Sequence, residues 1–98
     1  MDGQLRWQVA DDRLTLAGEL ERETLLPLWQ QRAEVMGRVE IIDVAGLQRV
    51  DSDGLALLVH LRQIVLERGK APRFTGITDK LRSLITLYNL QKIIAEGE

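Results

Sequence analysis

The chain has no cysteine, which excludes disulfide bonds and thiolate metal sites. It has one histidine, His60, so no histidine cluster can form to bind a metal. Aromatic residues make up only 4% of the chain, which argues against a base-stacking surface for nucleic acid. The net charge of −2 gives no electrostatic attraction to nucleic acid or anionic lipid. These shortages argue against a metal-binding protein and against a nucleic-acid-binding protein.

Long hydrophobic runs are also missing, since none approaches the ~20 residues that span a bilayer. The start, residues 1–4, lacks the basic and apolar regions of a signal peptide, so we expect a cytoplasmic protein. The 98 residues, 45% of them hydrophobic, fit a single folded domain spanning 1–98. We expect residues 91–98 to be a weakly ordered tail.

Hydrophobic periodicity predicts the order β-β-α-β-α-β-α. Alternating apolar residues predict a first pair of strands, which the turn at Ala10–Asp12 joins as a hairpin. A buried central strand follows later, and a short connection at 45–50 leads from it to the second helix. The expected bounds are strands at 5–9, 14–20, 39–44 and 71–75, and helices at 24–36, 54–68 and 78–88.

Local signals mark the ends of these elements. Thr24 is the predicted N-cap of the first helix, which places Pro27 in its first turn, and Gly37 is its predicted stop. Pro72 cannot donate to a strand ladder, which puts the last strand at an edge, and Asn89 suits a left-handed C-cap. Right-handed crossovers make strands two to four parallel and the first antiparallel. The fold class is therefore α/β, with helices packed on a four-stranded mixed sheet.

The stretch Val50-Asp51-Ser52-Asp53-Gly54-Leu55 is the most informative in the chain. It places a hydroxyl between two carboxylates where the second helix starts, and helix starts present unpaired N–H groups and partial positive charge. As an N-cap, Ser52 would contribute about 1 kcal/mol. As a phosphate acceptor it would benefit from the helix N-terminus, although Asp51 and Asp53 would repel the phosphate. Docking of a partner is a third role, and the three are not exclusive.

Catalysis finds little support at the same stretch. Asp43, Asp51 and Asp53 are potential ligands for magnesium, or groups for acid–base chemistry, but acidic residues are favourable at helix starts for capping reasons alone. Ser52 has no general base near it in sequence, and His60 lies about two helical turns away. We therefore expect no enzyme activity, no metal and no cofactor, with His60 facing solvent.

The second helix carries more apolar surface than one sheet face requires. Leu55, Val59 and Leu66 widen its core stripe, either by packing under neighbouring helices or by forming a docking patch. Gly54 would allow another chain to approach this turn closely. The predicted partner-binding residues are Asp51, Ser52, Asp53, Gly54, Leu55 and Val59.

The strand followed by Val-Asp-Ser-x-Gly-Leu and a helix resembles the signature of STAS domains, the fold of bacterial anti-sigma factor antagonists. The resemblance covers essentially the whole chain. It implies the STAS fold and a regulatory Ser/Thr at Ser52, the position that is phosphorylated in the antagonists.

Within this family the chain is most similar to the STAS subunits of phospholipid-transporting ABC complexes. The stretches that carry this are 18–20 with 25–29, 50–52 with 54–61, and 87–90. Those subunits usually have Thr in place of Ser52 and a small residue in place of Asp53.

This closer resemblance implies a non-catalytic subunit, peripheral to the inner membrane, that docks on the ATPase in a complex with the permease. Such a transporter maintains the lipid asymmetry of the outer membrane. The rival interpretation is an anti-sigma factor antagonist switched by phosphorylation of Ser52.

Overall fold

The computed structural model describes residues 4–94, which form one sheet with helices on one side of it. The predicted strand and helix types occur in the predicted order, except that two short helices replace the first. The elements are β1 (Leu5–Ala10), β2 (Arg13–Leu20), α1 (Leu26–Gln30), α2 (Arg32–Val35), β3 (Ile41–Val50), α3 (Ser52–Glu67), β4 (Arg73–Thr75) and α4 (Asp79–Leu87).

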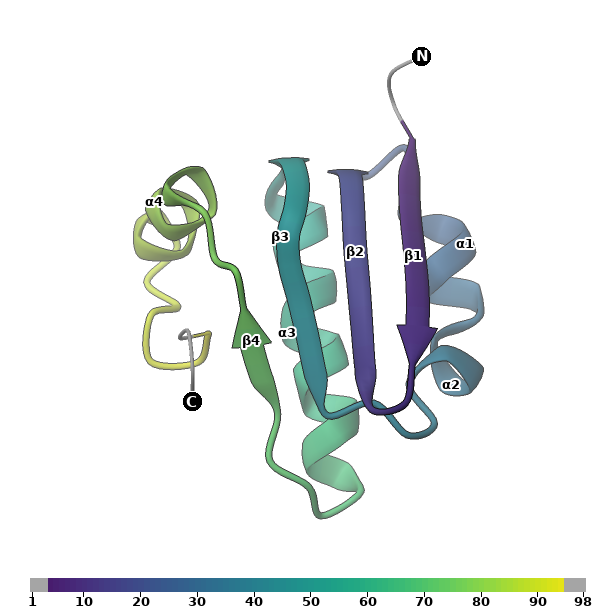
Figure 1. Ribbon diagram of the computed structural model, residues 1–98. Helices are drawn as coiled ribbons and strands as arrows, with labels where there is room; N and C mark the ends of the chain where they lie inside the picture. The colour runs from purple at the N-terminus through teal and green to yellow at the C-terminus, as the bar shows by residue number, and fades with distance from the viewer. Residues whose placement is uncertain (1–3, 95–98) are drawn as a thin grey trace.

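The sheet has the order β1-β2-β3-β4, with β1 antiparallel to β2 and the other pairs parallel. This confirms the predicted hairpin, the parallel strands and the edge position of the last strand. In Figure 1 the helices α1, α2 and α3 lie behind the sheet, while α4 lies beyond the β4 edge. The carboxyl ends of β2 and β3 meet at the top of the view, where α3 begins.

The core fills the space between the sheet and α3. Alternate residues of β2 point into it, as do those along one side of α3. Fully enclosed side chains include Leu14, Leu16, Leu20, Ile42, Val44, Leu58 and Leu61. This layer fixes α3 against β2 and β3, and therefore fixes where the start of α3 lies.

The prediction of one helix over 24–36 is wrong. The backbone turns at Gln31, with φ of −101° and ψ of 10°, which separates α1 from α2. Thr24 caps neither helix, because its hydroxyl accepts from the Glu21 N–H at 2.9 Å and lies 2.7 Å from the Glu19 carbonyl. α2 ends before Gly37, which lacks the left-handed φ of a glycine stop.

The central strand is longer than predicted, since β3 continues through the segment 45–50 that we expected to be a connection. Its whole length pairs with β2, and two register shifts absorb the extra residues. This extension brings Val50 to the end of β2 beside Leu20.

The remaining bounds differ from the predictions by a few residues. Asn89 has the predicted left-handed φ, 59°, and Thr78 caps α4. Residues 91–93 form a turn and Ile94 is buried in the core. The predictions on residues 1–3 and 95–98 lie outside the described residues. Among residues 4–94, no helix is long and apolar enough to cross a membrane.

Candidate functional site

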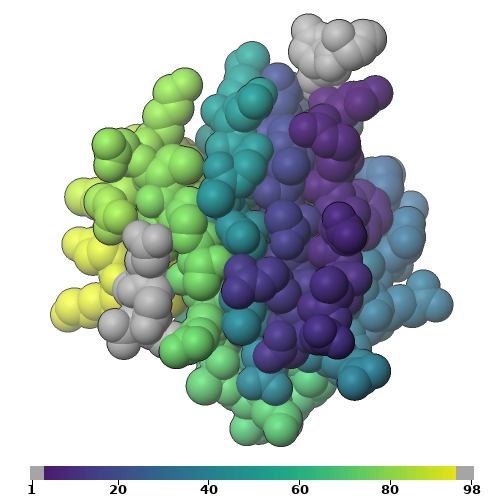
Figure 2. All heavy atoms as spheres, in the orientation of Figure 1, coloured from purple at the N-terminus to yellow at the C-terminus, as the bar shows by residue number. Residues whose placement is uncertain are grey.

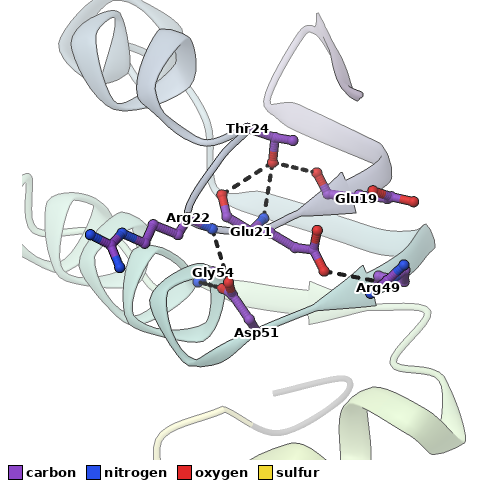
Figure 3. Close-up of polar contacts among 7 residues, drawn as sticks. All are labelled: Glu19, Glu21, Arg22, Thr24, Arg49, Asp51 and Gly54. Atoms are coloured by element: carbon purple, nitrogen blue, oxygen red, sulfur yellow. Dashed lines mark hydrogen bonds and ion pairs between the residues drawn. The ribbon is translucent and has the colours of Figure 1, made fainter. Parts of the chain in front are cut away.

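The start of α3 is built around Asp51. Its carboxylate accepts two backbone N–H groups, from Gly54 at 2.8 Å and from Arg22 at 2.9 Å (Figure 3). Asp51 is therefore the N-cap, and the prediction that Ser52 caps the helix is wrong. The carboxylate also ties the loop after β2 to the first turn of α3.

Gly54 is required by the chain's own packing. A Cβ at this position would lie 2.9 Å from the Leu20 carbonyl carbon and closer still to its oxygen. The close approach that the sequence suggested for another chain is thus made by β2. Because Gly54 is buried, it supports the turn from inside.

The loop that follows β2 is held by further polar contacts (Figure 3). Thr24 bonds the backbone of Glu19 and Glu21, and the Glu21 carboxylate lies 3.3 Å from the Arg49 guanidinium of β3. Together with Asp51, these contacts place the loop and the start of α3 in one fixed arrangement.

Ser52 and Asp53 lie on the outside of this turn. Both are exposed, and neither side chain makes a hydrogen bond or ion pair within residues 4–94. Ser52 is the first residue of α3 and Asp53 belongs to its first turn. Their polar groups are available to a partner without loss of a contact in the fold.

Beside Asp53 the surface is hollowed between α1 and α3. The hollow is lined by Arg22, Leu25, Trp29, Asp53, Ala56, Leu57 and His60. The Trp29 and His60 rings lie 4.7 Å apart between centroids, and the Arg32 guanidinium lies 3.7 Å from the Trp29 ring centroid. This is a cation–π arrangement that holds the indole in place. The hollow is therefore lined by apolar side chains and has charged groups at its rim.

Sequence reasoning missed this hollow, because it placed His60 in solvent and assigned no separate role to Trp29. Both side chains are half-buried and pack on each other. A signal was available, since the two residues belong to the stretches 25–29 and 54–61 that the family resemblance had singled out.

The apolar residues predicted for the docking patch separate in the structure. Leu55 is only 2% exposed and belongs to the core, so it is not a surface contact. Val59 is half-buried, and Leu66 is exposed toward the far end of α3. On α3, Val59 and Ala56 share the helix face of Ser52.

Two of the three carboxylates considered for a catalytic or metal site have partners of their own, while Asp53 has none within residues 4–94. Asp43 accepts from the Ala45 N–H at 3.0 Å and pairs with Arg13 at 3.4 Å, while Asp51 caps α3. Residues 4–94 hold no group of three or more acidic or histidine side chains placed to bind a metal.

The chain matches known proteins in sequence and in fold. A family model described as "Mlab, STAS domain" matches residues 4–95. The chain belongs to this STAS domain family. It is 41% identical over 90 residues to the intermembrane phospholipid transport system binding protein MlaB of Escherichia coli (strain K12), covering 92% of this chain and 93% of that protein. The MlaB of Haemophilus influenzae is 33% identical over 101 residues, with 93% and 96% covered.

Solved structures support the STAS fold. The phosphorylated form of the Bacillus cell fate determinant SpoIIAA aligns with a TM-score of 0.65 at 15% identity, covering 96% of this chain and 91% of SpoIIAA. The unphosphorylated form of this anti-sigma factor antagonist gives 0.62 at 16% identity, with 85% and 82% covered. At such low identity the likeness concerns the fold of the STAS domain alone.

Proposed function

We propose that this STAS domain is a non-catalytic accessory subunit of a phospholipid-transporting ABC complex. The observation that carries the proposal is the 41% identity to E. coli MlaB, a phospholipid transport system binding protein, over nearly the full length of both chains. In this role the chain binds the ATPase subunit and supports its assembly and activity. ATP is bound by the ATPase, and the permease completes the complex.

The proposed docking surface consists of Arg22, Trp29, Ser52, Asp53, Val59 and His60. Its polar centre is the free Ser52 hydroxyl with the Asp53 carboxylate, and its apolar part is the hollow beside Trp29. Such a combination of an aromatic anchor with a polar rim is typical of protein interfaces. Asp51 and Gly54 lie under this surface and support it indirectly, because they fix the turn that carries Ser52.

The proposed location follows from the partner. The chain is cytoplasmic and associates with the inner membrane through the transporter complex, which maintains the lipid asymmetry of the outer membrane. The finding that no described helix can span a bilayer is compatible with attachment through protein contacts.

Co-purification with the ATPase subunit tests the proposal. In Ser52→Arg a long charged side chain stands in the centre of the docking surface, so we expect recovery of the chain with tagged ATPase to fall at least about tenfold. The matched control is Ser83→Arg, which adds the same side chain at an exposed serine of α4. Both variants should retain the unfolding temperature of the original chain. Recovery of Ser52→Arg at the level of the control would overturn the proposal.

A second candidate function is an anti-sigma factor antagonist switched by phosphorylation of Ser52. The observation that favours it is the exposed serine hydroxyl, which makes no hydrogen bond within the described chain. Mass spectrometry of the chain isolated from native cells separates the two. Stoichiometric phosphate on Ser52, together with a small soluble kinase as the main partner, would favour the switch. An unmodified Ser52 in a membrane-bound complex would favour the transporter.

A further inference from the structure

Part of the β3 edge has no neighbouring strand within residues 4–94. β4 pairs with β3 only from Ile41 to Asp43, although β3 runs on to Val50. Beyond residue 45, β2 is the only strand of the described chain that pairs with β3. Natural proteins usually cover or interrupt such an edge, because its free N–H and C=O groups can pair with another chain.

The course of the chain after β4 explains the gap. At Gly76, with a left-handed φ of 75°, the backbone crosses close to Ala45, and a Cβ there would lie 2.9 Å from the Ala45 Cα. The chain then leaves the sheet and enters α4 through its cap, Thr78. The Ala45 N–H is taken by the Asp43 carboxylate at 3.0 Å, so the open part of the edge begins after Ala45.

Backbone directions identify groups that face this edge. The Asp51 N–H donates to the Leu20 carbonyl of β2 at 3.3 Å. Successive N–H groups of a strand point to opposite sides, so the Val50 N–H and C=O point away from β2. They have no strand partner within residues 4–94.

A groove runs along this edge and gives it room. It has a volume of about 370 Å³ and is lined by β3 from Leu47 to Val50 and, across from it, by Lys80, Leu81 and Leu84 of α4. In Figure 2 a notch separates the teal β3 from the green α4 at the top of the molecule. The groove thus offers an unpaired backbone on one side and apolar side chains on the other.

One cation at the groove has no ion-pair partner among residues 4–94. Glu21 and Arg49 pair with each other at 3.3 Å, and Asp51 is occupied by two backbone N–H groups. The Lys80 ammonium has no ion-pair partner in the described chain. It is the cation at this groove that is left for a ligand, and it would attract a carboxylate.

We propose that the open edge of β3 binds an extended peptide segment that carries an acidic side chain opposite Lys80. The peptide backbone pairs with the edge near Val50, in the manner of strand addition. One set of alternate side chains enters the groove against Leu81 and Leu84, while an acidic side chain reaches Lys80. The proposal does not depend on the transport role, because the groove belongs to the isolated chain.

A blocked peptide that alternates Val and Glu is a suitable probe, with the Val and Lys version as its control. Titration into the isotope-labelled full-length chain, followed by NMR, should shift the amide signals of 47–50 and 80–84. We expect the Val and Glu peptide to bind at least about tenfold more tightly than the Val and Lys peptide. Lys80→Glu should reverse this preference, whereas Lys70→Glu, at an exposed lysine outside the groove, should leave it unchanged.

Backbone methylation tests the pairing itself. Two versions of the Val and Glu peptide carry N-methyl groups on alternate residues, and only the version with its free N–H groups toward β3 should bind. Equal binding of both versions would overturn strand addition. Absence of shifts in the groove, or association of two copies of the chain through this edge in sedimentation, would overturn the proposal as a whole.

Discussion

The inner and outer sides of the α3 start differ in what they do for the fold. On the inner side, Asp51 and Gly54 are held by Arg22 and Leu20 from the neighbouring chain segment. On the outer side, Ser52 and Asp53 are exposed, and their side chains make no hydrogen bond or ion pair within residues 4–94. A motif of four adjacent residues therefore combines two structural positions with two that are free for binding. Substitutions on the two sides should separate stability from partner binding.

The largest loss of stability is expected for Gly54→Ala. The new Cβ would overlap the Leu20 carbonyl, which belongs to the backbone of β2 and cannot swing away. We expect the free energy of unfolding, measured in urea, to fall by about 3 kcal/mol. Helix propensity alone predicts the opposite, a gain of up to about 1 kcal/mol.

Gly37→Ala is the control for this change, because a Cβ there would meet its nearest neighbour, the Glu34 carbonyl, at 3.4 Å. It should alter stability by less than about 1 kcal/mol. If Gly54→Ala were as stable as the original chain, the inner side of the turn would not be set by the contact with β2.

A smaller loss is expected for Asp51→Ala, which removes both hydrogen bonds of the carboxylate. The cap contributes about 1 kcal/mol, and the bond from the Arg22 N–H contributes a similar amount. The free energy of unfolding should therefore fall by about 2 kcal/mol. Asp51→Asn keeps one acceptor oxygen and should lose about half as much. Hydrogen exchange of the Arg22 amide should speed up in Asp51→Ala, which removes its acceptor. An unchanged Arg22 amide would contradict the link between the two segments.

The topology was predictable because it depends on patterns that the sequence displays directly. Leu14 and Leu16 alternate with polar residues, and the apolar run around Ile42 marks a central strand. The end of β3 was not predictable in this way. Ala45, Gly46 and Gln48 do not alternate in polarity, and the strand continues because β2 lies beside it.

The N-cap of α3 could not be identified from the sequence either. Three adjacent residues, Asp51, Ser52 and Asp53, all suit an N-cap. The choice of Asp51 depends on the Arg22 N–H, which is brought there from 29 positions away. The pairing of Trp29 with His60 also depends on tertiary packing. The sequence thus indicates where the site lies, while the fold decides which residues face outward.

Ser52→Ala should have the smallest effect on stability. It should also separate the inner and outer sides of the α3 start most sharply. The hydroxyl is exposed and bonds nothing within the described chain, so the free energy of unfolding should change by less than about 0.5 kcal/mol. In the proposed complex the loss of one hydrogen bond should weaken binding to the ATPase by about threefold to tenfold. Ser52→Thr keeps the hydroxyl and should bind normally. If Ser52→Ala lost about 1 kcal/mol of stability while binding the ATPase unchanged, Ser52 would belong with Asp51 as a capping residue, and its role at the docking surface would be wrong.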